Sequence, residues 1–211
     1  MLEVYMGRKA GNSLISGIGF NDGKHLMSIE CKTLKEYSLW QDMLLRCTEK
    51  YWEKKPTYIG TTCSENFRSY SYFYEWCQEQ IGFKNKEEGG VRVAWHLDKD
   101  LLSKGNKIYG EDTCVFLPKT INLLLTKRDK SRGKYPLGVS WHSPMKKLRA
   151  KCCVGGGVQQ LIGYYDTPEQ AFQAYKTFKE SYIKQVAEQY KSQIDPRAYK
   201  ALLEYEVNIE D

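Results

Sequence analysis

The sequence predicts an α+β fold because three patterns follow one another along its 211 residues. Apolar side chains recur at helical spacing up to residue 90, whereas residues 91–130 have the order strand, loop, strand and helix. From residue 134 three short strands precede one long helix, and a short helix is expected within residues 193–211. With 41% hydrophobic and 27% charged residues, the composition is typical of a chain that buries a core. We therefore expect four parts, 1–90, 91–130, 134–192 and 193–211.

The first part is predicted to be helical and rich in turns. Repeated glycines in residues 17–23 favour tight turns, and the segment does not match a phosphate-binding loop. Thr33 with Glu36 three residues later is a capping-box pattern that predicts the start of a helix at residue 34. Two helical stripes are expected to pack into the core, namely Leu39, Trp40, Met43, Leu44 and Cys47, and Phe67, Tyr70, Phe73, Tyr74 and Cys77.

The second part carries the predicted strand, loop, strand and helix. Residues 91–97 alternate as a half-buried strand does, residues 104–107 have turn composition, and residues 114–117 are apolar enough for a second strand. Pro118 suits the first turn of a helix that continues through Ile121, Asn122 and Leu125.

The third part is predicted to be a three-stranded sheet followed by a helix. The strands are residues 138–142, 147–152 and 159–165, joined by a Ser-Pro turn and a Gly-Gly-Gly turn. Thr167 is the expected cap of the helix, with Pro168 at its first position. Asp195 is expected to cap the last helix, and the apolar stripe of the long helix is Ala171, Tyr175, Phe178, Tyr182 and Val186.

Basic residues gather in one segment. Residues 127–151 contain nine lysines and arginines and one aspartate, whereas the whole chain has a net charge of +6. The rings of Tyr135, Trp141 and His142 lie among these charges and can stack on bases or pack on sugars. The pattern favours a polyanion, most simply nucleic acid, over a solvated surface. The basic residues are Lys127, Arg128, Lys130, Arg132, Lys134, Lys146, Lys147, Arg149 and Lys151.

Neither export nor a membrane partner is expected. No apolar run approaches the roughly 18 residues of a membrane span, and Glu3, Arg8 and Lys9 interrupt the start of the chain. The seven cysteines include no C-x-x-C pair, so the support for a zinc site is weak. We expect reduced thiols and a cytoplasmic protein.

Oxygen donors gather where the first strand of residues 91–130 ends. Asp98 and Asp100 lie there, and His96 shares a strand face with Asp98 because residues two apart point the same way. With Asn122 on the following helix, these residues could hold a hard divalent cation such as Mg²⁺ or Mn²⁺. From composition alone, the preferred interpretation is a solvated corner between strand and turn, where aspartate is common.

Some segments of the sequence point to a particular protein family more specifically than the patterns above. They include Leu-Asp-Lys-Asp-Leu-Leu at 97–102, Tyr-Pro-Leu-Gly-Val at 135–139, and residues 17–22, 40–47, 56–60, 105–109, 114–118 with 121–122, and 163–175. Together they resemble the HNH-type, homing-endonuclease-like nucleases of tailed bacteriophages that carry a C-terminal domain similar to the plant APETALA2 DNA-binding domain. The resemblance covers nearly the whole chain. It implies a ββα-metal core in residues 91–130, an APETALA2-like domain in residues 134–192 and, if a phage encodes the protein, the cytoplasm of a bacterial host.

The resemblance implies a nuclease site with one Mg-type ion. Asp98 and Asn122 match the ligand positions on the first strand and on the helix. Lys99 occupies the position of the usual general base, a histidine, so His96 or Asp100 would substitute or the site would be silent. Asn106 matches the asparagine that orients the active-site loop. We therefore expect a Mg²⁺-dependent endonuclease that nicks or cuts duplex DNA, with a catalytically silent DNA-binding module or regulator as the alternative.

The resemblance also implies that the strands of the C-terminal domain lie in the major groove of DNA. Alternate residues would then face DNA, with Arg149 suited to a bidentate guanine contact and the lysines to phosphates. Leu148, Ala150 and Cys152 would pack on the helix. The DNA-facing set is Ser140, His142, Lys147, Arg149, Lys151 and Gln160.

Overall fold

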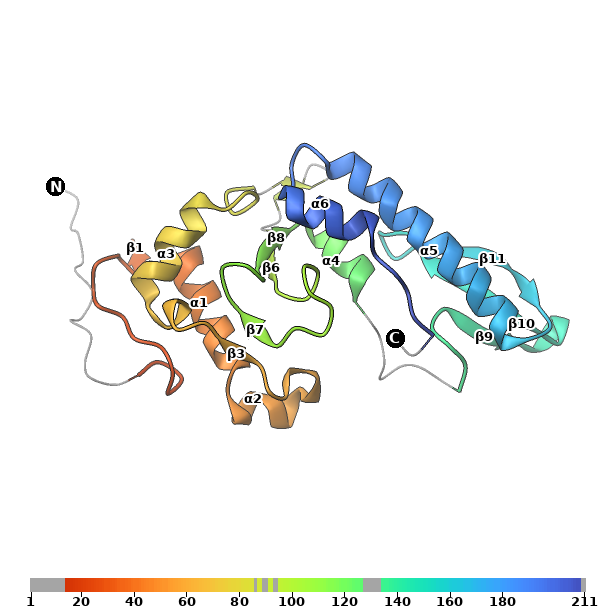
Figure 1. The fold of residues 1–211 in the computed structure, drawn as a ribbon, viewed down its shortest axis with the longest axis horizontal. Helices are drawn as coiled ribbons and strands as arrows, with labels where there is room; N and C mark the ends of the chain where they lie inside the picture. Colours follow the sequence, from red (N-terminus) through yellow and green to blue (C-terminus); the bar gives the residue numbers. More distant parts are fainter. Residues whose placement is uncertain (1–13, 86, 89–90, 93–94, 127–133, 210–211) are drawn as a thin grey trace. The chain divides into compact units, whose positions relative to one another are not determined.

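The computed structural model describes residues 14–85, 87–88, 91–92, 95–126 and 134–209, and it has the mixed α+β composition that the sequence predicts (Figure 1). Within these residues six α-helices accompany small sheets of two or three strands. The chain divides into two compact units, one formed by residues 1–86 and 97–116 and the other by residues 87–96 and 117–211. None of the described helices is long and apolar enough to cross a membrane.

Two helices, α1 (Lys35–Arg46) and α3 (Tyr70–Glu79), build the core of the first unit. Trp40 of α1 is fully buried and donates a hydrogen bond from Nε1 to the carbonyl oxygen of Phe67 at 2.8 Å. Met43, Leu44 and Phe73 are also buried, which confirms the predicted core faces. The shorter elements are β1 (Ser28–Ile29), β2 (Lys32–Thr33), α2 (Glu49–Lys54), η1 (Pro56–Tyr58), β3 (Thr62–Cys63) and η2 (Asn66–Arg68).

The start of α1 differs from the predicted capping box. Thr33 lies in β2 and pairs with Ser28 of β1, so its backbone belongs to a hairpin. Leu34 is the N-cap instead, without a side-chain hydrogen bond to the helix. The hairpin thus displaces the predicted cap by one residue.

The glycine-rich segment 17–23 lies against α1. Gly17 and Gly23 have φ of +71° and +78°, which supports the predicted turns. A Cβ on Gly19 would lie 2.3 Å from Cδ1 of Leu44, so only glycine allows this close approach.

Residues 95–126 follow the predicted order of strand, loop, strand and helix. The elements are β6 (His96–Asp98), β7 (Ile108–Tyr109), β8 (Val115–Leu117) and α4 (Lys119–Leu125). β6 pairs with β8, and β7 runs parallel to β3. Instead of one strand over residues 91–97, the described residues contain β6 and a separate β5 (Val91–Arg92), because β5 pairs with β4 (Glu87–Glu88). Pro118 is the N-cap of α4 rather than its first residue.

The second unit contains an antiparallel sheet of order β11-β10-β9 with the long helix α5 (Pro168–Tyr190) along it (Figure 1). The strands β9 (Val139–His142), β10 (Lys147–Cys153) and β11 (Gln159–Tyr165) end within one residue of the predicted limits. The turn η4 (Ser143–Met145) joins β9 to β10. Thr167 caps α5 by accepting a hydrogen bond from the backbone N–H of Gln170, and Asp195 caps α6 (Pro196–Leu203).

One face of the sheet packs against α5 as predicted. Gly138, just before β9, has a φ of +77°, and a Cβ on it would lie 2.1 Å from Cδ2 of Tyr175. Glycine is therefore required where the chain passes over this ring. The buried cluster between sheet and helix consists of Leu148, Ala150, Cys152, Ala171, Phe172, Tyr175 and Val207.

Candidate functional site

Asp98 organises the start of the loop that follows β6. Its Oδ1 accepts hydrogen bonds from the backbone N–H groups of Asp100 at 3.0 Å and Leu101 at 2.8 Å. Burial raises the pKa of Asp98 above its ordinary value, while these two hydrogen bonds act in the opposite direction. Oδ2 of Asp98 has no hydrogen bond to another residue that the structure describes, so this oxygen is available to a ligand.

Lys99 is buried and paired. Its side chain is 6% exposed, and Nζ lies 2.6 Å from Oδ1 of Asp100 and 2.9 Å from the carbonyl oxygen of Asn106. An ammonium held by a carboxylate has no lone pair with which to accept a proton from water. The geometry therefore gives Lys99 a positioning role and does not support a role as general base.

Asn106 ties the two sides of the same loop together. Its Nδ2 donates to the carbonyl oxygens of Lys99 at 2.8 Å and Ile108 at 2.7 Å. Its Oδ1 accepts from the backbone N–H of Ile108 at 3.0 Å. These contacts are those of a loop-orienting residue, the role that the resemblance implies.

His96 and Asn122 meet in the second unit. Nδ2 of Asn122 lies 3.2 Å from Nδ1 of His96. The first turn of α4 sets this position, since the backbone N–H of Asn122 donates to the carbonyl oxygen of Pro118. Because the amide nitrogen faces His96, the amide oxygen Oδ1 is the atom of Asn122 that could bind a cation or accept a hydrogen bond. Asp98, Lys99, Asp100 and Asn106 belong to the first unit.

A carboxylate oxygen such as that of Asp98 and an amide oxygen such as that of Asn122 are each ligands that a hard divalent cation prefers. The described residues contain no group of three or more His, Cys, Asp or Glu side chains that could hold a metal. Mg²⁺ does not require such a group, because it usually keeps several waters and binds one or two carboxylates together with substrate phosphates. The chemistry of each side chain therefore suits Mg²⁺, while Asp98 belongs to the first unit and Asn122 to the second.

The side of the sheet opposite α5, here called the open sheet face, carries the basic side chains. Burial alternates along β10, where the half-buried Lys147, Arg149 and Lys151 alternate with the buried Leu148, Ala150 and Cys152. Across the sheet, His142 is opposite Lys147, and Ser140 is opposite Arg149. All five residues thus share the face on which the sequence placed them.

Arg149 lies at the centre of the open sheet face. Its Nη2 donates to Oγ of Ser140 at 3.3 Å, and the ring of His142 lies 5.0 Å from that of Tyr164. Nε of Arg149 and Nδ1 of His142 are buried and have no hydrogen-bond partner among the described residues. Buried polar atoms without partners are costly, so they favour a ligand that would bind them.

A bulge between Ala150 and Lys151 corrects the assignment of Gln160. Beyond the bulge, Lys151 is opposite Leu161, and Cys152 is opposite Gln160, which puts Gln160 on the α5 side. Tyr164, opposite Arg149, joins the open sheet face instead. Two consecutive tyrosines on a strand point to opposite faces, and that signal could have identified Tyr164 in the sequence.

The remaining basic residues lie at the margins. Lys134 and Lys146 are exposed, and Nζ of Lys134 is 5.1 Å from the centre of the Tyr135 ring. Nζ of Lys147 lies 3.2 Å from Oδ1 of Asp166. Lys127, Arg128, Lys130 and Arg132 lie outside the described residues.

Function is inferred from this placement of side chains and from the sequence motifs. No protein-family model, curated protein or solved structure matches the chain.

Proposed function

We propose that this protein binds duplex DNA through the open sheet face. The observation that carries the proposal is the separation along β10, where Leu148, Ala150 and Cys152 are buried beside α5 and the alternating basic residues lie on the other side. A β-sheet can enter the major groove, where its outward side chains meet base edges while lysines meet phosphates. An APETALA2-like mode of binding is consistent with this arrangement.

Within this interface, Arg149 is the proposed base-reading residue. A guanidinium presents a planar set of donors that can pair with O6 and N7 of guanine. The contact to Ser140 orients one end of the guanidinium, while Nε has no partner among the described residues. The flexible, point-charged lysines are better suited to phosphates.

The phosphate contacts are tested by the salt dependence of binding. Changing Lys146, Lys147 or Lys151 to methionine should lower the slope of log K against log salt by about 0.9 for each lost phosphate contact. The loss should be similar on every DNA sequence. Fluorescence-anisotropy titrations at several salt concentrations measure the slope, with exposed Lys200→Met on α6 as the matched control. Unchanged slopes for all three variants would remove these lysines from the interface.

The base contact is tested by Arg149→Lys, which keeps the positive charge but removes the planar guanidinium and its paired N–H donors. On a site selected from random DNA, affinity should fall about 5- to 150-fold, corresponding to about 1 to 3 kcal/mol. On scrambled DNA the change should be small. The same titrations give both affinities, together with those of Arg149→Ala. Equal losses on the two DNAs would reduce Arg149 to a phosphate contact.

We further propose that residues 91–130 form an HNH-like site that hydrolyses a DNA phosphodiester bond. Within the second unit, the contact of Asn122 with His96 supports this reaction class, and in the first unit Asp98 keeps an oxygen that accepts no hydrogen bond from the described residues. A bound Mg²⁺ would supply charge stabilisation at the scissile phosphate. Asp98 and Asn122 would bind the ion, His96 would accept the proton of the attacking water, and Lys99 and Asn106 would position the loop.

The alternative is a DNA-binding module or regulator without turnover, favoured by the paired Lys99 at the expected base position. Supercoiled plasmid distinguishes the two. A nuclease should convert it to nicked or linear DNA with Mg²⁺ or Mn²⁺ and lose this activity with chelator. DNA binding without cleavage under any of these conditions would establish the alternative.

A further inference from the structure

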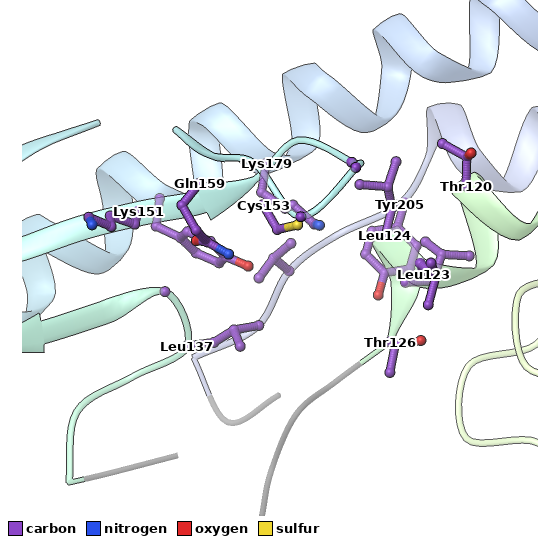
Figure 2. Close-up of a pocket in the computed structure, with 17 residues that line it drawn as sticks. Thr120, Leu123, Leu124, Thr126, Leu137, Lys151, Cys153, Gln159, Lys179 and Tyr205 are labelled. Carbon is purple, nitrogen blue, oxygen red and sulfur yellow. The ribbon is translucent and has the colours of Figure 1, made fainter. Parts of the chain in front are cut away.

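A pocket of about 260 Å³ lies within the second unit (Figure 2). Leu123 and Leu124 of α4 line it on one side, and Leu137 and Tyr175 line it elsewhere. The glycine turn at residues 155–157 adds backbone rather than side chains. Its walls are therefore mainly apolar, as is typical of small-molecule sites.

Lys179 of α5 is a buried cation in this lining. It is 7% exposed, and its ammonium has no hydrogen bond or ion pair with another residue that the structure describes. By contrast, Lys176 on the same helix forms an ion pair with Glu180 at 2.7 Å. Figure 2 draws Lys179 beside Cys153, whose thiol is no fixed counter-ion.

The environment of Lys179 disfavours its charge. Burial lowers the pKa of Lys179, and the nearby thiols of Cys152 and Cys153 oppose this only in part. Desolvating an ammonium without a counter-ion is costly, so an anion bound beside it would offset that cost. The pocket thus combines an apolar wall with a buried positive group that lacks a negative partner.

The size of the pocket limits its occupant. An apolar cavity of about 150 Å³ holds benzene, which has six non-hydrogen atoms. In proportion, about 260 Å³ holds about ten. This is too small for a nucleotide and matches a carboxylate with an aliphatic tail of about seven carbons.

We propose that this pocket binds a small amphipathic carboxylate, with the carboxylate against Lys179 and the apolar tail against Leu123, Leu124 and Leu137. The pocket shares one lining residue, Lys151, with the open sheet face, and its proposed ligand does not depend on the proposed DNA cleavage.

Calorimetric titration of the full chain with octanoate tests the proposal. Two ligands are the controls: octan-1-ol has the aliphatic tail without the carboxylate, and acetate has the carboxylate without the tail. Octanoate should bind saturably at one site with a dissociation constant of about 10 µM to 1 mM. Octan-1-ol and acetate should each bind at least about tenfold more weakly, because each lacks one of the two interactions. Failure of octanoate to saturate a single site would overturn the proposal.

Variants separate the head contact from the tail contact. Lys179→Met should weaken octanoate at least about tenfold, leave octan-1-ol unchanged and raise the melting temperature of the free protein, because it removes a buried charge. Leu123→Trp, at an exposed position of the lining, should weaken both ligands by filling the tail space. Exposed Lys184→Met on the same helix is the control and should bind octanoate like the parent protein. Equal octanoate affinity in Lys179→Met and the parent would contradict the assignment of Lys179.

Discussion

Replacing Asp98 or Asn122 with alanine is expected to abolish Mg²⁺-dependent cleavage of plasmid DNA. Each change removes one of the two protein oxygens proposed to hold the cation, and a site with so few ligands has no substitute for either. DNA affinity should stay within a few fold of the parent, because neither residue lies on the open sheet face. Nicking rates and anisotropy titrations on the same preparations measure the two effects.

Asp98→Asn separates the chemistry from the local structure. An asparagine keeps an oxygen that can accept the backbone N–H bonds of Asp100 and Leu101, but it carries no charge for the cation. We expect Asp98→Asn to fold like the parent and still to lose cleavage. Parental cutting by Asp98→Ala and Asn122→Ala alike would place the nuclease site elsewhere in the chain.

The second large effect is expected at His96. If His96 accepts the proton of the attacking water, His96→Ala should lower the single-turnover cleavage rate by about two to four orders of magnitude. DNA binding should be unaffected. Quenched-flow or gel-based time courses with excess enzyme measure the rate of the chemical step.

His96→Gln is the matched variant for this test. A glutamine can still form a hydrogen bond with Nδ2 of Asn122, but it is no base. Loss of rate in both variants supports proton transfer, whereas activity in His96→Gln alone would make His96 a positioning residue for Asn122. Full activity in both, with loss in Asp100→Ala, would assign the base to Asp100, whose side chain is 62% exposed.

Local patterns in the sequence were sufficient to predict much of the second unit. The cap at Thr167, Pro168 at the first position of α5 and the alternation of β10 all depend on residues within a few positions of one another. Helical spacing likewise identified Trp40, Met43 and Leu44 as core residues. Such features depend on the geometry of the local backbone, so the residues of each segment are sufficient to predict them.

Only the tertiary structure decided which long-range partners these segments have. The hairpin of β1 and β2 displaced the cap at Thr33. The bulge in β11 moved Gln160 to the α5 side, while Tyr164 lies opposite Arg149 on the open sheet face. The burial of Lys99 against Asp100 and Asn106, and of Lys179 without a counter-ion, depends on residues that local periodicity does not relate. Register and burial arise from contacts between distant segments. The sequence by itself therefore determined the elements and their faces. Packing decided which side chains were paired and which were left available to a ligand.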